Sequence, residues 1–368
     1  MNKDARRIET KCVQGGYTPG NGEPRQIPIV QSTTFKYATS EDMGKLFDLE
    51  ASGYFYSRLQ NPTCDTVAAK ICELEGGSAA MLLSSGQAAS FFAVFNIAGQ
   101  GDHIVSSSSI YGGTYNLFAV TMKRMGIEFT FVSPDCTEEE LNAAFKPNTK
   151  AVFGETIANP ALTVLDIEKF AKAAHAHGVP LIIDNTFATP INCRPFEFGA
   201  DITKATAQLM RDFGCSQSPQ SAFYLNLGLE SLHVRMPRHC LNAQKVAEFL
   251  ESNDKIGWVN YPSLPSNKYY KLAQKYMPNG TCGVVSFGVK GGRAAAEKFM
   301  KALKTVAIET HVADARSCCL HPASATHRQM NEEELIAAGV PSDLVRLSCG
   351  LESYQDLIDD ISQALESI

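Results

Sequence analysis

The sequence of 368 residues has no apolar run long enough to cross a membrane, no excess of basic residues and no C-x-x-C cysteine pair. Its N-terminal stretch also lacks the apolar core of a signal peptide. The 33 basic and 39 acidic residues give a net charge of −6, which offers no basic surface to nucleic acid. These absences predict a cytoplasmic protein that binds a small molecule and neither nucleic acid nor a membrane.

A metal site is not indicated by the cysteines or the histidines. The eleven cysteines are scattered apart from one adjacent pair, so we expect reduced thiols that serve mostly in packing. His175 and His177 end an amphipathic helix, where a cation complements the helix dipole. His321 and His327 lack the spacing of metal ligands. The sequence therefore predicts no metal.

An alternation of short apolar segments and longer amphipathic segments runs from about residue 61 to residue 187. This alternation is typical of βαβ crossovers and predicts an α/β fold with a mainly parallel sheet. The predicted helices are 64–77, 86–99, 114–126, 138–145 and 166–178, and the predicted strands are 79–85, 103–109, 127–133, 150–156 and 179–187.

The two ends of the chain have a different texture. Proline and glycine interrupt residues 1–60, which we expect to form an extended arm. After residue 228 a long helix over 229–253 precedes two separated strands at 282–292 and 343–352, a pattern that indicates a smaller α+β domain. The predicted organisation is an arm over 1–60, a large domain over 61–228 and a small C-terminal domain over 229–368.

Ligands of parallel sheets bind beyond the carboxyl ends of the strands, so polar residues at those ends are candidate site residues. Asp184 ends an apolar strand, where a carboxylate serves a turn or, alternatively, holds the protonated nitrogen of a pyridine ring such as that of pyridoxal phosphate. The residues at these positions are Ser85, Gly86, Tyr111, Asn159, Asp184 and Thr186.

Three further features could hold an anion or a flat ring. Ser85, Gly86 and Gln87 open a helix, which suits a phosphate, although serine there is more often only a cap. Tyr111 could stack on a ring. Arg346 lies within an apolar strand and needs an anionic partner, either an internal acidic residue or a substrate carboxylate.

These segments, in their order along the chain, resemble the Cys/Met-metabolism enzymes that depend on pyridoxal 5'-phosphate, the cystathionine γ-synthase-like group of fold type I. Within that family the likeness is greatest to the O-acetylhomoserine sulfhydrylases. The segments that carry the resemblance include "GYFYSRLQNPT", "MLLSSGQAAS", "SSIYGGTYN", "DNTFATP", "RPFEFGADI", "SAFYLNLGLESL", "HVADARSCCLHPASATHRQM" and "DLVRLSCGLES".

The resemblance implies a large domain with a parallel sheet of the seven-stranded type, which binds pyridoxal phosphate, and a small C-terminal domain. It implies a homotetramer built from dimers with shared active sites, in which the arm contacts a neighbouring subunit. Tyr56 and Arg58 would reach the cofactor phosphate from that neighbour, and Ser85, Gly86 and Gln87 would bind the phosphate within the chain.

The resemblance also assigns roles around the ring. Tyr111 and Asp184 are the implied catalytic residues: Tyr111 stacks on the ring and assists at the γ-leaving group, and Asp184 holds the ring nitrogen. The remaining implied contacts are Asn159 and Thr186 against the ring, and Ser317 and Arg346 on the substrate α-carboxylate.

The implied reaction is γ-replacement on O-acetyl-L-homoserine by sulfide or a thiol, which gives homocysteine or methionine and acetate. A methionine γ-lyase, a cystathionine lyase or a cystathionine synthase remains an alternative. Methionine γ-lyases typically carry cysteine at the position of Gly113, which counts modestly against that option.

One departure from the family lies at "GADITKATAQLMRDFG", residues 199–214. The family continues from "GADI" into a His-Ser-x-Thr-Lys motif whose lysine forms the Schiff base, whereas here a downstream segment follows directly. We therefore do not assign Lys204 as that lysine. We expect the natural polypeptide to contain a further segment between Asp201 and Thr203, because its deletion would leave strands unpaired. The alternative is a non-catalytic protein that binds pyridoxal phosphate without a lysine or serves as a scaffold.

Overall fold

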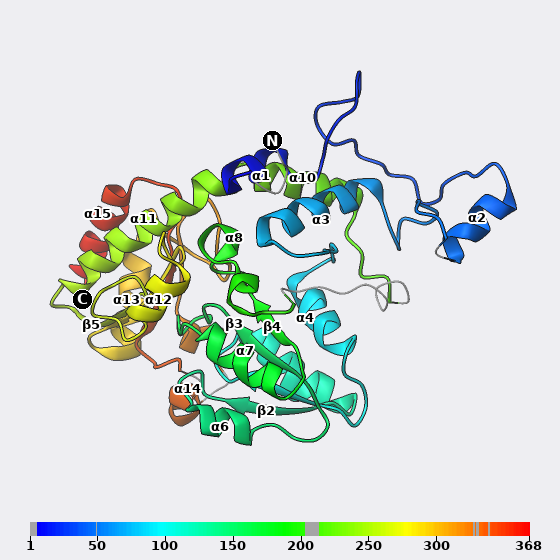
Figure 1. Ribbon diagram of the computed structural model, residues 1–368. Coiled ribbons are helices and arrows are strands. Elements are labelled where there is room, and N and C mark those ends of the chain that lie inside the picture. Colours follow the sequence, from blue (N-terminus) through cyan, green and yellow to red (C-terminus); the bar gives the residue numbers. More distant parts are fainter. Residues whose placement is uncertain (1–5, 49, 203–212, 327, 329–330, 338) are drawn as a thin grey trace.

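The computed structural model describes residues 6–48, 50–202, 213–326, 328, 331–337 and 339–368. Its helices and two separate sheets are shown in Figure 1. The first sheet has four strands, all parallel, in the order β2, β1, β3, β4. Their bounds are β1 His103–Ser107, β2 Glu128–Val132, β3 Thr149–Glu155 and β4 Leu181–Asp184.

The second sheet is mixed and has the order β5, β6, β9, β8, β7. It lies in the C-terminal part of the chain, where the sequence predicted an α+β unit. Its strands are β5 Ile256–Asn260, β6 Val284–Val289, β7 Ala307–Ile308, β8 Cys318–Leu320 and β9 Leu344–Ser348.

The helices follow the amphipathic segments of the sequence. All five predicted helices of residues 64–178 are present, the third as α5 followed by the π-helix η2. None of the described helices is both long and apolar enough to cross a membrane. The helices are α1 Ile8–Gln14, α2 Ser40–Phe47, α3 Pro62–Glu75, α4 Gly86–Phe95, α5 Gly112–Asn116, η2 Leu117–Met122, α6 Glu138–Ala143, α7 Ile167–Ala176, α8 Thr189–Asn192, η3 Pro195–Phe198, α10 Pro219–Glu230, α11 Leu232–Glu251, α12 Tyr270–Tyr276, α13 Gly292–Ala302, η4 Pro322–Ser324, α14 Glu332–Ala337 and α15 Tyr354–Leu365.

Helices cover both faces of the parallel sheet because both faces of its inner strands are apolar. Val152 and Ile183 face a cluster that contains Phe170 of α7, and Phe153 faces a second cluster that contains Phe118 of η2. The first cluster continues into the C-terminal part of the chain through residues of β6, β9, α11 and α15. The two sheets therefore share one hydrophobic core.

The strand predicted over 79–85 is wrong. There, Leu83 alone pairs, in an antiparallel bridge with Ser216, and the Ser84 amide donates to the Cys215 carbonyl at 2.9 Å. Beyond β4, one parallel bridge joins Ile182 to Ile202. Neither bridge extends into a strand among the described residues. The predicted parallel α/β class is confirmed, with four strands in the described part of the chain. The resemblance implied a sheet of the seven-stranded type.

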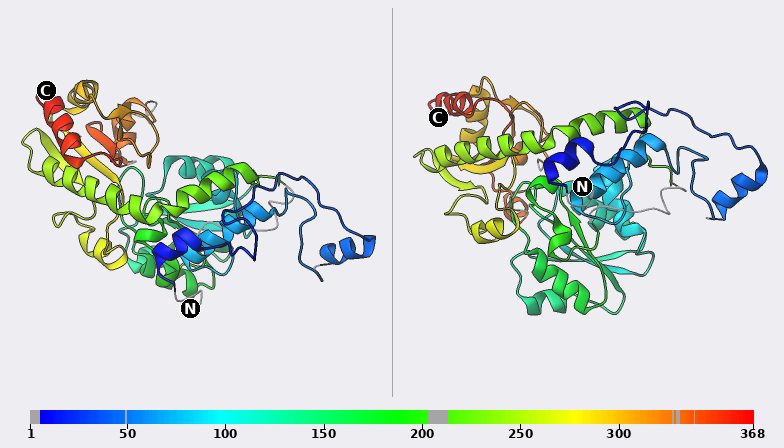
Figure 2. Two further views of the ribbon diagram at one scale, coloured as in Figure 1. Left: turned by 90° about the horizontal axis from the view of Figure 1, so that it is seen from above. Right: turned by 45° about the horizontal axis from the view of Figure 1, so that its top comes forward.

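Within the predicted arm, α2 projects away from the rest of the molecule (Figures 1 and 2). Helices α10 and α11 run from the side of the arm toward the C-terminal sheet (Figure 2). The boundaries of the three predicted parts stay a prediction.

We expect Phe170→Ala to lower the free energy of unfolding by about 3–5 kcal/mol, because it removes a fully buried ring from the shared core. Lys172→Ala is the matched control, since the Lys172 side chain is 72% exposed on the same helix. Urea unfolding of both variants measures the difference. Equal losses in the two variants would contradict the assigned core.

Candidate functional site

The carboxyl end of β4 places Asp184 in a buried position, 8% exposed. Both the amide and the hydroxyl group of Thr186 donate to Asp184 Oδ1, the amide at 3.0 Å. The Thr156 amide donates to the Asp184 carbonyl at 3.0 Å, which ties this strand end to β3. The turn function of Asp184 is thus present, and its carboxylate also lies at the strand end where a ligand of the sheet binds.

Arg346 is buried in the middle of β9 with 6% exposure. Nη1 donates to Asn159 Oδ1 at 3.2 Å, and Nη2 donates to the carbonyls of Thr310 at 2.8 Å and His311 at 3.2 Å. Burial lowers the pKa of Arg346. In the described part of the chain no carboxylate pairs with this guanidinium, and its Nε has no acceptor. A buried cation with neutral partners and an unused donor suits an incoming carboxylate.

Tyr111 lies within electrostatic range of this cation. Its amide donates to Glu155 Oε1 at 2.7 Å, which anchors the start of α5 to the end of β3. The residue is 47% exposed, and its phenol group is close enough to Arg346 to act on the pKa of the guanidinium. A Cβ atom at Gly113 would lie 2.5 Å from Tyr111 Cε1 and 2.8 Å from Gln87 Nε2. The missing side chain at Gly113 therefore makes room for the Tyr111 ring.

The N-terminus of α4 is open to solvent. The Ser85 hydroxyl group accepts from the Ala88 amide at 3.0 Å, so Ser85 is a helix cap, as its position suggests. The amides of Gly86 and Gln87 have no acceptor among the residues that the structure places. Gln87 lies beside Gly113 and Tyr111, which brings this helix end to the same region as the tyrosine ring.

The structure joins some of the predicted residues and separates others. Contacts link Arg346 to Asn159, and Arg346 lies near Tyr111. Ser317 is buried, and its hydroxyl group donates to Glu352 Oε2 at 2.8 Å, so its polar atoms already have internal partners. Thr203 and Lys204 lie outside the described residues.

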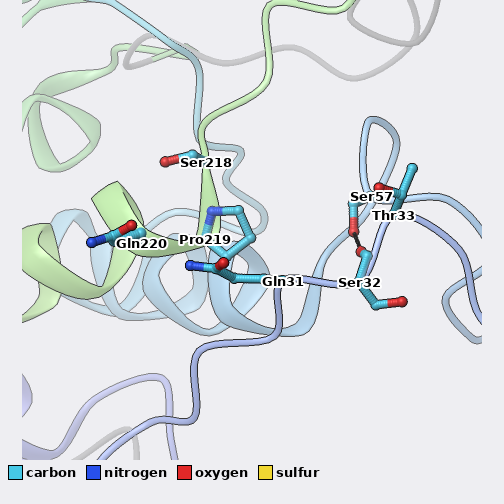
Figure 3. Close-up of a pocket in the computed structure, with 7 residues that line it drawn as sticks. All are labelled: Gln31, Ser32, Thr33, Ser57, Ser218, Pro219 and Gln220. Carbon is cyan, nitrogen blue, oxygen red and sulfur yellow. Dashed lines mark hydrogen bonds between the residues drawn. The ribbon is translucent and has the colours of Figure 1, made fainter.

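Tyr56 and Arg58 belong to the arm. The Arg58 guanidinium lies 5.1 Å from the centre of the Tyr56 ring. Between them, Ser57 lines a polar pocket of about 350 Å³ with Ser32 and Ser218, at the start of α10 (Figure 3). None of the residues that line this pocket is among those predicted to hold the cofactor, although Ser57 lies between Tyr56 and Arg58.

The sequence analysis missed several residues around the site. The carbonyls that hold Arg346 belong to Thr310 and His311, and a main-chain acceptor leaves no signal in side-chain identity. The ligand atoms of Glu309, His311 and Cys318 lie within 4.8 Å of one another, a group that the spacing argument did not consider. Glu75 also escaped notice, because it ends an ordinary amphipathic helix.

The residues present fit pyridoxal 5'-phosphate. The open amides at the start of α4 suit its phosphate, the exposed Tyr111 ring offers a surface for its pyridine ring, and Asp184 offers a carboxylate for its ring nitrogen. Arg346, which suits a substrate carboxylate, lies within electrostatic range of Tyr111.

Known proteins match this chain along its whole length. The sequence profile of the Cys/Met metabolism PLP-dependent enzymes matches residues 9–208 and 202–366. A homocysteine synthase from Schizosaccharomyces pombe is 38% identical and covers 100% of both chains, and an O-acetyl-L-homoserine sulfhydrylase from Leptospira meyeri is 36% identical, over 98% of this chain and 97% of that protein. A Campylobacter jejuni structure described with N'-pyridoxyl-lysine-5'-monophosphate is 33% identical, with a TM-score of 0.93 over 98% of this chain and 100% of that one.

The comparisons also concern the junction between Ile202 and Thr203, where the sequence departs from the family pattern. The alignment with the Schizosaccharomyces pombe protein spans 428 positions and includes all 368 residues, so at least 60 positions have no residue of this chain opposite them. The profile match divides into two stretches that overlap at residues 202–208. The family profile therefore divides at the same junction where the sequence departs from the family pattern. By its profile match and its full-length relatives, the chain belongs to the Cys/Met metabolism family of pyridoxal phosphate-dependent enzymes.

Proposed function

We propose that this protein catalyses γ-replacement on O-acetyl-L-homoserine, in which sulfide or a thiol displaces acetate to give homocysteine or methionine. The observation that carries the proposal is the buried Arg346, which lacks a carboxylate partner in the described chain and lies within electrostatic range of Tyr111. The names of the homocysteine synthase and sulfhydrylase relatives support this substrate.

Each residue would contribute a separate function. Bound pyridoxal 5'-phosphate supplies a carbonyl that takes the substrate amine and an electron-poor ring. Asp184 would keep the ring nitrogen protonated, Arg346 would orient the substrate carboxylate, and the Tyr111 hydroxyl group would move a proton at the γ-leaving group. Asn159 and Thr186 would lie against the ring, and Ser317 would support the carboxylate site.

Gly113 favours replacement over a methionine γ-lyase reaction. A Cβ atom at this position would lie 2.5 Å from the Tyr111 ring, so a cysteine there requires a different tyrosine position. The glycine of this chain allows the observed placement of Tyr111 and Gln87. The geometry thus gives a physical basis for the sequence argument against that alternative.

No lysine of this sequence is assigned to form the Schiff base with the cofactor, which leaves a second candidate function. The sequence passes directly from Ile202 to Thr203, and relatives have at least 60 aligned positions that this chain does not fill. If the natural polypeptide lacks these residues as well, we propose a protein that binds pyridoxal phosphate without a covalent bond, or a scaffold. If it contains them, the γ-replacement proposal stands.

The arm supports a shared site in an oligomer. Phe47 is 63% exposed and packs on Phe55 with ring centres 4.6 Å apart, which places apolar surface on a segment remote from the core. We propose that the arm contacts a neighbouring subunit in a cytoplasmic homotetramer built from dimers, and that Tyr56 and Arg58 complete the neighbour's phosphate site.

The deciding experiment combines mass and activity on protein expressed from the natural gene. A sulfhydrylase should form homocysteine from O-acetyl-L-homoserine and sulfide, and borohydride should fix a pyridoxyl group covalently to the chain. An intact mass of 40.0 kDa, with no fixed pyridoxyl group and no homocysteine, would contradict catalysis and favour the second candidate.

We expect Arg346→Met to weaken binding of O-acetyl-L-homoserine to the pyridoxal phosphate-loaded protein roughly 10- to 100-fold, because a charged hydrogen-bonding partner is lost. The free energy of unfolding should stay within about 1 kcal/mol of the original, since methionine also relieves the cost of burying the guanidinium. Titration calorimetry and urea unfolding measure the two effects.

Arg316→Met is the matched control, because the Arg316 side chain is 86% exposed and pairs with Asp314. Its affinity and stability should match the original protein. Unchanged substrate affinity in Arg346→Met would contradict the assigned carboxylate site, whereas a large loss of stability would make Arg346 a structural residue.

A further inference from the structure

A buried polar network lies directly behind the end of β4. Glu75, the last residue of α3, is 9% exposed, and Asn185, the residue after Asp184, is 5% exposed. Asn185 Nδ2 donates to Glu75 Oε1 at 3.3 Å and to the Cys193 carbonyl at 2.9 Å. The side-chain carboxyl group of Glu75 thus contacts the turn that follows Asp184.

The same asparagine connects the two strands that carry site residues. Asn185 Oδ1 accepts from the Thr156 hydroxyl group at 2.9 Å, and the Thr156 amide donates to the Asp184 carbonyl at 3.0 Å. Thr156 directly follows Glu155, whose carboxylate accepts from the Tyr111 amide at 2.7 Å. A change in the position of Asn185 therefore reaches Asp184 along β4 and Tyr111 through the end of β3.

The pKa of the Glu75 carboxyl group lies near neutral pH. Burial raises the pKa of Glu75 to about 7, while the Asn185 hydrogen bond and the charge of Arg194 oppose the rise. Arg194 pairs with Glu197 at 2.6 Å, so its charge is shared. Burial, aided by Glu75, raises the pKa of Cys193 to about 12, which keeps that thiol neutral. Among the described residues, the charged group that acts on the pKa of Glu75 is Arg194, whose partner is Glu197.

We propose that Glu75 is a positioning residue for the cofactor site, whose ionised carboxylate holds Asn185 and thereby fixes Asp184 and Tyr111 for binding of pyridoxal 5'-phosphate. An ionised carboxylate accepts a stronger hydrogen bond from the Asn185 amide than a carboxylic acid does. Its negative charge behind Asp184 also favours a protonated ring nitrogen. The inference rests on the proposed binding of pyridoxal phosphate by this chain.

The proposal gives cofactor affinity and protein stability opposite dependences on pH. The pKa of Glu75 is about 7 in the folded protein, against an ordinary value of 4.5. The unfolded chain therefore releases this proton first, and the contribution of Glu75 to stability falls as the pH rises from 4.5 to above 7. The ionised form that lowers stability is the form that holds Asn185.

The test compares the original protein with Glu75→Gln, which keeps the shape of the side chain but cannot ionise. Each is titrated with pyridoxal 5'-phosphate between pH 6 and pH 8.5 by equilibrium dialysis. The ratio of the two affinities cancels the titration of the cofactor itself. We expect the ratio to change about threefold or more in favour of the original protein as the pH rises through 7. A ratio that is constant with pH would overturn the proposal.

A stability measurement and two further variants complete the test. Glu75→Gln should unfold at a higher temperature than the original at pH 8, and the difference should shrink toward pH 5. Glu73→Gln, which removes an acid of the same helix that pairs with Arg6, should follow the affinity profile of the original. Thr156→Val breaks the contact of Asn185 with β3 and should flatten the affinity profile while Glu75 still titrates in the stability measurement.

The outcomes separate this inference from the proposed function. A protein that binds no pyridoxal phosphate at any pH contradicts both. Binding with the same pH dependence in the original, Glu75→Gln and Thr156→Val contradicts the role of Glu75 alone.

Discussion

The site depends on the cost of burying the guanidinium of Arg346 inside β9 without a carboxylate partner in the described chain. A folded protein tolerates such a charge only where surrounding polar atoms partly solvate it. Two main-chain carbonyls and the Asn159 side chain provide that solvation and leave the Nε nitrogen without an acceptor. The loop that supplies the carbonyls and the turn after β3 that supplies Asn159 therefore surround one cation that no carboxylate of the described chain neutralises.

The parallel sheet contributes the complementary half of the site. Its strands end at a common edge, where Asp184 closes β4 and Glu155 anchors the start of α5. The hydrophobic cluster beneath them joins this sheet to the C-terminal sheet that carries Arg346. Apolar packing thus sets the distance between two parts of the proposed site. One is the edge of the parallel sheet at Asp184, and the other is Arg346 in the C-terminal sheet.

Sequence reasoning recovered the parts that depend on local patterns. Hydrophobic periodicity located the helices of residues 64–178 and placed Asp184 at the end of a strand, as β4 has it, while the roles of Asp184 and Tyr111 stay predictions. It failed at 79–85, because the apolar run there has the composition of a strand but meets a partner only at Leu83. It also missed Glu75 and the carbonyls of Thr310 and His311, since burial and main-chain contacts arise only when distant segments pack together. The absence of the His-Ser-x-Thr-Lys motif, by contrast, was visible only by comparison with the family pattern.

Because both sheets share one hydrophobic core, cofactor binding would affect the stability of the whole chain. Because one apolar cluster spans both sheets, unfolding of either sheet exposes apolar surface of the other. A ligand that binds only the folded form then raises the folded population of every segment, including those far from the ligand. In a cell, vitamin status would thus govern how much of this protein escapes proteolysis.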